Sequence, residues 1–154
     1  MKRDIAGGSV MLKQATKEDA VTLAKLAIQM WEDNEIEELA EHFEGLMASE
    51  EAACFLKYKD EVAVGFAQCQ LRHDYVEGTE TSPVGYLEGI LVEEAYRHRG
   101  YAKELLGACE KWAKSKGCSE FASDCELENE ESLHFHMAMQ FEEANRVICF
   151  KKSI

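Results

Sequence analysis

The pattern of hydrophobic and polar positions along this chain has two periods, and each predicts a type of element. Apolar residues three or four apart predict amphipathic helices near residues 16–31, 35–48, 101–116 and 129–139. Runs of strand-forming residues predict strands at 10–14, 53–58, 62–71, 86–92 and 120–125, and a final strand pair at 141–144 and 147–152. This order predicts an α/β (α+β) fold with a mixed, largely antiparallel sheet and flanking helices.

Local residues sharpen several of these elements. Thr16 and Asp19 have capping-box spacing at the first helix, and Lys59-Asp60-Glu61 is typical of a hairpin turn. Gly65 indicates a bulge within its strand, and Gly117 suits the position just after the third long helix.

Composition indicates one compact domain. The chain has 154 residues, 46% hydrophobic, with one proline, which fits a flexible tail at 1–9 and a single domain at 10–154. Residues 1–9 lack the apolar stretch of a signal peptide, and no apolar run reaches the roughly 20 residues of a membrane span. We therefore expect a cytoplasmic protein with no membrane partner.

The six cysteines are spread singly, without C-x-x-C spacing. This predicts small buried hydrophobic residues in a reducing compartment, and no metal site.

Charge narrows the class of ligand. The formal charge is −13, from 30 acidic and 17 basic residues, which disfavours nucleic acid and favours cationic ligands. The acidic residues concentrate at 32–44, where the alternative interpretation is a solvated helix face that aids solubility. One turn, at 97–103, is basic instead, so the chain is expected to bind two ligands of opposite charge.

That basic turn joins the apolar strand 86–92 to a long helix. Gly100 leaves the helix-starting amides bare, and Arg97 and Arg99 add two cations, so the turn predicts a diphosphate site. The alternative is an ordinary strand–turn–helix whose basic turn is merely solvated.

The run Arg97-x-x-Gly100-x-Ala102 after an apolar strand resembles the acetyl-CoA signature of the GCN5-related N-acetyltransferases. The resemblance implies that loop amides hold the CoA pyrophosphate, that the pantetheine arm enters a splayed central strand pair, and that the Leu91 N–H stabilises the oxyanion. The residues it assigns to acetyl-CoA are Ile90, Leu91, Val92, Arg97, His98, Arg99, Gly100, Tyr101, Ala102, Lys103 and Asn129.

A wider set of motifs resembles one branch of that family over about residues 10–152. Segments 72–76, 82–84, 87–90, 116–118, 122–124 and 141–143 are together similar to aminoglycoside 6′-N-acetyltransferases. The resemblance implies direct acetyl transfer in a ternary complex, antibiotic resistance and a homodimer. Asn145 and the absence of Pro-Gly-His-Pro after Trp31 depart from the pattern of some relatives.

Two carboxylates are the candidate catalytic groups. Glu88 lies inside an apolar strand, where a carboxylate is costly to bury without a partner, and alternation puts it on the face of Tyr86 and Ile90. It would bind a cationic amine and take its proton; the alternative is a structural carboxylate at a bulge. Asp124, near the end of the next strand, would add a second anchor, and the alternative is an Asp that only ends the strand.

Three further side chains complete the expected site. Trp31 and Tyr75 match positions that touch the antibiotic, although a Trp ending an amphipathic helix is commonly core. His136 stands where relatives carry a Tyr that protonates the departing thiolate, and the alternative is a surface histidine. His134, two residues away, faces elsewhere and makes a poor metal pair with it.

The sequence therefore predicts an acetyl-CoA-dependent N-acetyltransferase acting on the 6′-amine of aminoglycosides. Two alternatives stay open: transfer to another amine (a polyamine, an amino sugar or a protein N-terminus), or a non-catalytic CoA-binding module.

Overall fold

The computed structural model describes residues 2–3 and 7–154. Within them, six strands form one sheet in the order β1-β2-β3-β4-β5-β6. Only β5 and β6 pair in parallel; the other neighbours are antiparallel. The strands are β1 (Lys2–Arg3), β2 (Ser9–Gln14), β3 (Ala52–Lys59), β4 (Val62–Arg72), β5 (Val84–Val92) and β6 (Phe121–Ser123).

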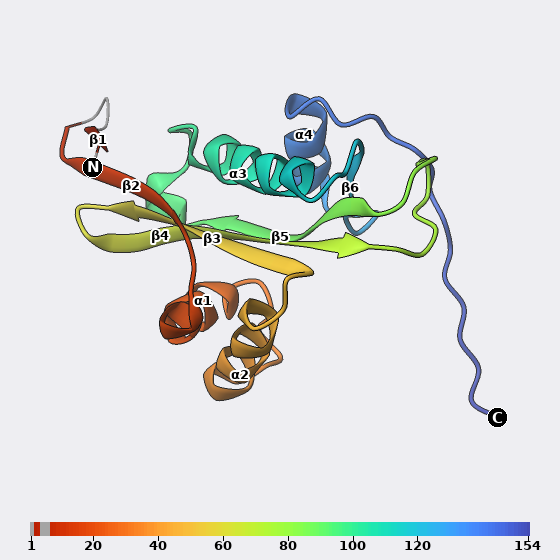
Figure 1. Cartoon of the computed structure of the whole chain (residues 1–154), viewed down its shortest axis with the longest axis horizontal. Coiled ribbons are helices and arrows are strands. Elements are labelled where there is room, and N and C mark those ends of the chain that lie inside the picture. The colour runs from red at the N-terminus through yellow and green to blue at the C-terminus, as the bar shows by residue number, and fades with distance from the viewer. Residues whose placement is uncertain (1, 4–6) are drawn as a thin grey trace.

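Helices cover both faces of this sheet (Figure 1). On one face lie α1 (Ala20–Ala27) and α2 (Ile36–Met47), and on the other lie α3 (Tyr101–Ser115) and α4 (Glu130–Ala138). Two large apolar clusters lie on opposite faces of the sheet, and a small third one joins Val76, Val84 and Tyr86. One large cluster joins α1 and α2 to the sheet around Leu23, Phe43 and Phe66, and the other large cluster joins α3 to it around Val64 and Leu105. The predicted mixed, largely antiparallel sheet with flanking helices is confirmed.

The predicted local signals are confirmed at several boundaries. The Thr16 N–H donates to the Asp19 carboxylate over 2.8 Å, which closes a short 3₁₀ turn before α1. Asp60 and Glu61 both have positive φ, as a two-residue hairpin turn between β3 and β4 requires. Gly117 follows α3 with φ +91°.

Gly65 lies at a bulge, as its position in the strand predicts. Lys57 pairs with Gly65 but Tyr58 pairs with Ala63, so one extra residue is inserted in β4. A Cβ at Gly65 would come within 2.9 Å of the Leu91 carbonyl oxygen, so the close approach of β5 excludes a side chain there. Gly65 thus lets β4 approach β5, the strand that carries Glu88.

The predicted strand pair at 141–144 and 147–152 is wrong. No residue from 141 to 154 belongs to a strand. Phe141 still packs against Phe121 and Asn145 hydrogen-bonds to Glu77, and the segment after them runs away from the body of the chain (Figure 1). Val147, Ile148 and Phe150 are 68%, 81% and 90% exposed. Apolar alternation favours a strand, but a strand forms only where a sheet edge accepts its hydrogen bonds, and this segment lies away from the sheet.

Three smaller expectations also change. The strand expected at 120–125 is confined to Phe121–Ser123. Cys54, Cys69, Cys109 and Cys118 are buried as expected, whereas Cys125 and Cys149 are exposed. Lys2–Arg3 pairs with β2 instead of belonging to a free tail. The predicted tail also includes residues 1 and 4–6, which lie outside the described residues.

No helix in the described part of the chain is long and apolar enough to cross a membrane. In residues 2–3 and 7–154, no group of three or more His, Cys, Asp or Glu is placed to hold a metal ion.

Candidate active site

The candidate site lies where β5 and β6 separate. The two strands pair through Gly85–Phe121, Tyr86–Ala122 and Leu87–Ser123. Within the described residues β6 ends there, whereas β5 continues to Val92. The splayed pair expected from the resemblance is therefore present, at the edge of this chain's sheet. It leaves the outer edge of the second half of β5 available to an extended ligand.

Glu88 occupies a bulge at this point of separation. Gln68 of β4 pairs with Gly89 and Cys69 pairs with Leu87, so Glu88 is the extra residue. The inserted residue shifts the alternation along β5. Glu88 and Tyr86 both contact Arg72, so they lie on the same face of the sheet, as expected. Ile90 packs with the α3 cluster, on the other face. The predicted place of Glu88 on the face of Ile90 is wrong, because strict alternation does not survive a bulge.

Arg72, the last residue of β4, holds the Glu88 carboxylate with three hydrogen bonds. Its Nε donates to Oε1 over 3.0 Å, and its Nη2 donates to Oε1 over 2.9 Å and to Oε2 over 3.0 Å. The guanidinium also stacks on Tyr86, with its Cζ 3.4 Å from the ring centroid. The Glu88 side chain remains 20% exposed, so it is a solvent-reachable carboxylate and not one sealed in apolar core.

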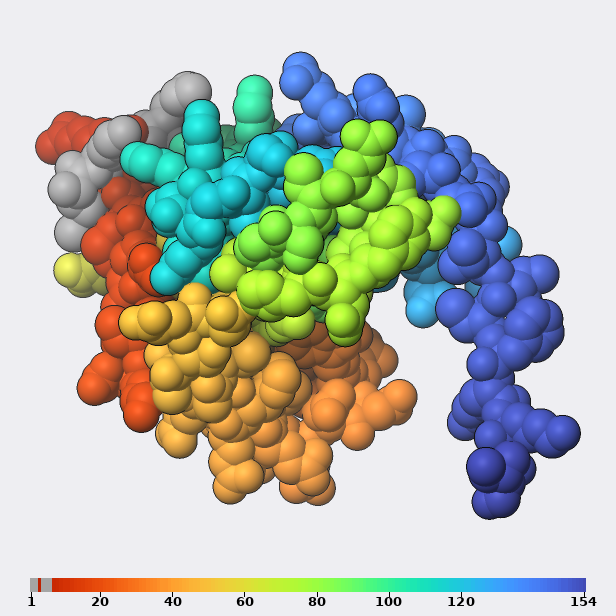
Figure 2. Space-filling view, turned by 45° about the vertical axis from the view of Figure 1, so that its right-hand side comes forward, coloured from red at the N-terminus to blue at the C-terminus, as the bar shows by residue number. Residues whose placement is uncertain are grey.

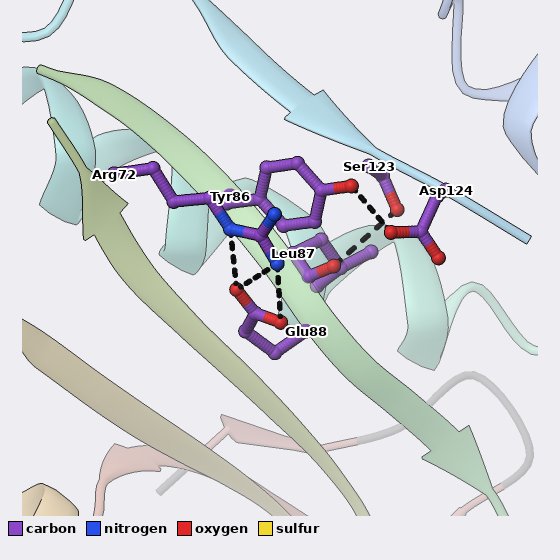
Figure 3. Close-up of polar contacts among 6 residues, drawn as sticks. All are labelled: Arg72, Tyr86, Leu87, Glu88, Ser123 and Asp124. Carbon is purple, nitrogen blue, oxygen red and sulfur yellow. Dashed lines mark hydrogen bonds and ion pairs between the residues drawn. The ribbon is translucent and has the colours of Figure 1, made fainter. Parts of the chain in front are cut away.

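Tyr86 links this ion pair to Asp124 (Figure 3). The phenol O–H of Tyr86 donates to the Asp124 carboxylate just beyond the end of β6. Burial, and then this hydrogen bond, raise the pKa of the Tyr86 hydroxyl well above its ordinary value, so the phenol stays a donor. The two predicted carboxylates are thus brought into one cluster, through Arg72 and Tyr86, across the separating strands.

Trp31 borders this cluster from the α1 side. Its ring packs on Phe43 and Phe66, with centroids 6.4 and 6.2 Å away, and the residue is half-buried. A Cβ at Gly89 would lie 3.0 Å from the indole, so Trp31 lies directly over the residue after Glu88. Trp31 is thus both a core residue and a wall beside the carboxylate. Tyr75 lies on the loop after β4 with 76% exposure, and its substrate contact stays a prediction.

The basic turn has the backbone that an anion site needs. His98 and Gly100 have φ of +62° and +83°, which directs successive amides toward one side before α3 begins at Tyr101. Arg97 fixes the turn, since its Nε donates to the Val92 carbonyl over 2.9 Å and its Nη1 lies 3.5 Å from Glu131 of α4. The predicted diphosphate site is therefore anchored to both β5 and α4.

Other residues assigned to acetyl-CoA have different surroundings. Tyr101 is 3% exposed, with the Lys57 ammonium 4.7 Å from its ring centroid, so only its backbone is suited to a ligand. Lys103 is exposed on the first turn of α3. The Asn129 side chain accepts from the Ser132 N–H over 3.0 Å and caps α4, and its contact with CoA stays a prediction.

His136 lies on the inner side of α4, against β6. Its Nε2 is 2.8 Å from Ser123 Oγ and its Nδ1 is 2.7 Å from the Ser132 carbonyl oxygen. The ring packs against Phe135 and Phe141, with centroids 5.6 and 5.1 Å away. His136 is half-buried and contacts Ser123, a residue that the sequence analysis did not single out. Whether it acts in catalysis or is a histidine without a catalytic role stays a prediction.

Arg72, Tyr86 and Ser123 are the residues that sequence reasoning missed. A lone carboxylate in an apolar strand implies a cationic partner, which was the one available signal for Arg72. Tyr86 and Ser123 become visible only when the parallel pairing of β5 with β6 is known.

The chain matches a known family. A family model described as the acetyltransferase (GNAT) family matches residues 20–141. The chain belongs to this family. The GNAT resemblance in the sequence and the fold that it implies are both confirmed.

Relatives within the GNAT family extend the match to nearly the whole chain. The "Aminoglycoside N(6′)-acetyltransferase type 1" of Stenotrophomonas maltophilia is 41% identical over 143 residues, covering 91% of each chain. The protein of that name from Salmonella typhimurium is 46% identical over 109 residues, covering 71% of this chain and 75% of its own length.

Solved GNAT structures agree in fold. The aminoglycoside N-acetyltransferase AAC(6′)-Iy in complex with CoA has a TM-score of 0.93 at 38% identity, covering 96% of this chain and 97% of that one. The same enzyme in complex with the bisubstrate analog CoA-S-monomethyl-acetylneamine has a TM-score of 0.91 at 37% identity, covering 96% and 100%.

Proposed function

We propose that the protein is an acetyl-CoA-dependent aminoglycoside 6′-N-acetyltransferase that confers antibiotic resistance. The observation that carries this proposal is the joined pair of carboxylates, Glu88 and Asp124, at the separation of β5 and β6. A GNAT relative holding a bisubstrate analog supports it, since that ligand links CoA to an aminoglycoside derivative.

Acetyl-CoA would bind from the end of β5 to the start of α3. The extended edge of Ile90, Leu91 and Val92 suits the pantetheine arm, and the bare amides at Gly100 suit the diphosphate. Arg99 and Lys103 are exposed on the same turn and add positive charge. The resemblance assigns the oxyanion to the Leu91 N–H, but Leu91 faces β4: its carbonyl oxygen lies beside Gly65, and Glu93, two residues on, donates its N–H to the Val64 carbonyl. Alternation leaves the Val92 N–H on the open edge of β5, so we propose that amide as the oxyanion donor.

The amine would bind against Glu88. A carboxylate has about four lone-pair positions, and Arg72 donates three hydrogen bonds to Glu88, so about one position is left. A single free position directs one N–H of the incoming ammonium and fixes its approach. Glu88 then takes the amine's proton, directly or through water, so that the neutral nitrogen attacks the thioester. Asp124 holds a second cationic group of the same substrate.

The test is a thiol-release assay with acetyl-CoA and either kanamycin or tobramycin. Wild type should release CoA in a drug-dependent manner, and mass spectrometry should show one acetyl group on the 6′-nitrogen. Glu88→Gln should lower kcat/KM by about 10²-fold, the lower range for a general base. Asp124→Asn should chiefly raise the KM for the drug, because it removes an anchor and leaves Glu88 in place.

A panel of amines separates this function from its alternatives. If kcat/KM is higher for a small polyamine, an amino sugar or a protein N-terminus than for the aminoglycosides, that amine is the acceptor. Binding of CoA without turnover on any amine would leave only the CoA-binding module. Resistance itself is tested by expression in a susceptible strain, where wild type and not Glu88→Gln should raise the inhibitory drug concentration.

We also propose a homodimer formed through the end of the C-terminal segment, residues 147–154. Figure 2 shows this segment projecting from the body of the chain. Its exposed apolar residues, Val147, Ile148 and Phe150, have the composition of a strand, and β6 lies at the edge of this chain's sheet. A second copy of the chain would cover both the exposed segment and the open edge of β6. In such a dimer the two chains exchange identical segments, and each segment pairs with the sheet edge of the other chain.

Sedimentation tests the dimer. Wild type should sediment as a dimer and Ile148→Asp as a monomer, while Val62→Asp, at a similarly exposed position (58%) in the β3–β4 hairpin, should leave the dimer intact. A dimer that survives Ile148→Asp would contradict this proposal. A cytoplasmic location is part of the same proposal, since the six cysteines are free thiols, as is usual in a reducing compartment.

A further inference from the structure

Ser123 lies where the thioester is expected under the proposed function. It is the last residue of β6 and pairs with Leu87, directly before the Glu88 bulge and the separation of the strands. A thioester presented to an amine on Glu88 therefore has its sulfur near the end of β6. Ser123 is half-buried, so its hydroxyl is sheltered from bulk water yet borders the opening.

The surroundings of His136 fix its hydrogen atoms. A carbonyl oxygen can only accept, so the Nδ1 that lies 2.7 Å from the Ser132 carbonyl carries a hydrogen. In the neutral ring Nε2 is then the acceptor, and the Ser123 hydroxyl donates to it over 2.8 Å. In the protonated ring both nitrogens donate, so the Ser123 hydroxyl accepts from Nε2 and its own hydrogen turns to the Leu87 carbonyl oxygen, 3.4 Å away at the point where the strands separate (Figure 3).

His136 is also held in place. Phe135 and Phe141 pack edge-on against the ring, and the Ser132 hydroxyl adds a contact of 3.3 Å to Nδ1. Both ring nitrogens are engaged, so the imidazole can reach a ligand only through Ser123. This differs from the role that the sequence predicts, in which His136 itself protonates the departing thiolate.

We propose that Ser123 is the group that protonates the departing thiolate, with His136 as the positioning residue that resupplies its proton. As the carbon–sulfur bond breaks and its electron pair stays on sulfur, Ser123 gives its hydroxyl hydrogen to that sulfur. His136 gives its Nε2 hydrogen to the Ser123 oxygen and becomes neutral. A proton from bulk water then restores the imidazolium, so protons and charge balance over one turnover.

The first test compares four variants with acetyl-CoA and an accepted amine. Ser123→Ala and His136→Gln should each lower kcat at least tenfold with little change in either KM, and Ser123→Thr should recover most of the loss because it restores a hydroxyl. The double variant should be no slower than the worse single variant, because the two residues act as one unit. Ser119→Ala and His134→Gln, both at exposed positions nearby, are the matched controls and should behave as wild type.

The second test changes the leaving group. A thiolate of low basicity leaves without a proton, so with S-acetyl 4-nitrothiophenol as donor the Ser123→Ala and wild-type enzymes should have equal rates. A merely structural role for Ser123 would slow both donors alike and would overturn the proposal. So would an acetyl group found on Ser123 by mass spectrometry in the absence of amine, because Ser123 would then be a nucleophile.

These outcomes are separable from the proposed function on which this inference rests. If wild type and Ser123→Ala turn over kanamycin at the same rate, Ser123 is not the proton donor, and the proposed acetyltransferase activity still stands. If wild type acetylates no aminoglycoside, the proposed acceptor is wrong. The Ser123 variants are then compared on whichever amine the enzyme does acetylate.

Discussion

Arg72 decides what Glu88 can do. A carboxylate at a bulge in an apolar strand would be costly without a partner, and Arg72 removes that cost with hydrogen bonds to both oxygens. The guanidinium is in turn held flat on Tyr86, whose hydroxyl reaches Asp124. One residue thereby fixes the orientation of the proposed base and couples it to the proposed second anchor.

We predict that Arg72→Gln lowers kcat/KM for the aminoglycoside at least tenfold, which corresponds to about 1.4 kcal/mol. Glutamine cannot donate the three bonds that orient Glu88 or stack as a planar cation. Arg72→Lys should recover little, because an ammonium is a point charge without the bidentate fork. Steady-state kinetics with both variants measures this; full activity of Arg72→Gln would show that Glu88 needs no orienting partner.

Part of this site can be predicted from the sequence, for a physical reason. Glu88 is predicted because a carboxylate conflicts with its apolar neighbours along the strand, and such a conflict is visible locally. Asp124 and Trp31 are predicted from their positions beside a strand end and an acidic segment, together with the family resemblance. Arg72 and Ser123 were missed because their partners are cross-strand neighbours. Those pairings depend on a register that the Glu88 bulge sets, and one shifted residue exchanges the faces of a strand.

At the level of elements, α3 carries two left-handed glycines at opposite ends. Gly100 starts the helix with φ +83° and Gly117 follows it with φ +91°, and a Cβ at either position would meet no atom within 4 Å. Both positions therefore carry the same backbone strain when mutated. Only Gly100 faces the proposed diphosphate, so the pair separates folding from binding.

We predict that Gly100→Ala and Gly117→Ala each destabilise the fold by about 1–2 kcal/mol, the cost of a left-handed alanine. Gly100→Ala alone should also raise the KM for acetyl-CoA about tenfold, because its methyl group stands among the amides that receive the phosphate. Thermal unfolding and acetyl-CoA titration provide the two readouts. Equal KM values for the two variants would place the CoA diphosphate away from this turn.

The fold was predicted where its signals are local and not where they need a partner. The helix stripe of α3, the β3–β4 turn and the Gly65 bulge all follow from residues close in sequence. The segment 147–152 has an equally good strand pattern, yet it is exposed because no sheet edge among the described residues of its own chain pairs with it. The hydrophobic pattern shows that a segment can form a strand, but the strand forms only when a neighbouring strand pairs with it.

At the level of the whole molecule, the two signs of charge are spatially divided. The net charge is −13, and Glu37, Glu38, Glu41 and Glu44 are all exposed on α2, on the face of the sheet opposite α3. The basic turn stands at the start of α3. A polycation approaching the Trp31 side therefore meets a negative field before it meets Glu88, and such fields raise encounter rates.

We predict that the KM for kanamycin rises at least threefold, with kcat unchanged, as ionic strength goes from about 0.01 M to about 0.1 M, because the screening length falls from about 30 Å to about 10 Å. Glu37→Gln with Glu41→Gln should flatten this dependence. Glu61→Gln with Glu110→Gln removes the same charge from exposed positions in the β3–β4 turn and on α3, and should leave it steep. Stopped-flow or steady-state kinetics across salt concentrations measures the slope. If the two double variants have the same slope, the negative field belongs to the molecule as a whole and not to the face that carries α2.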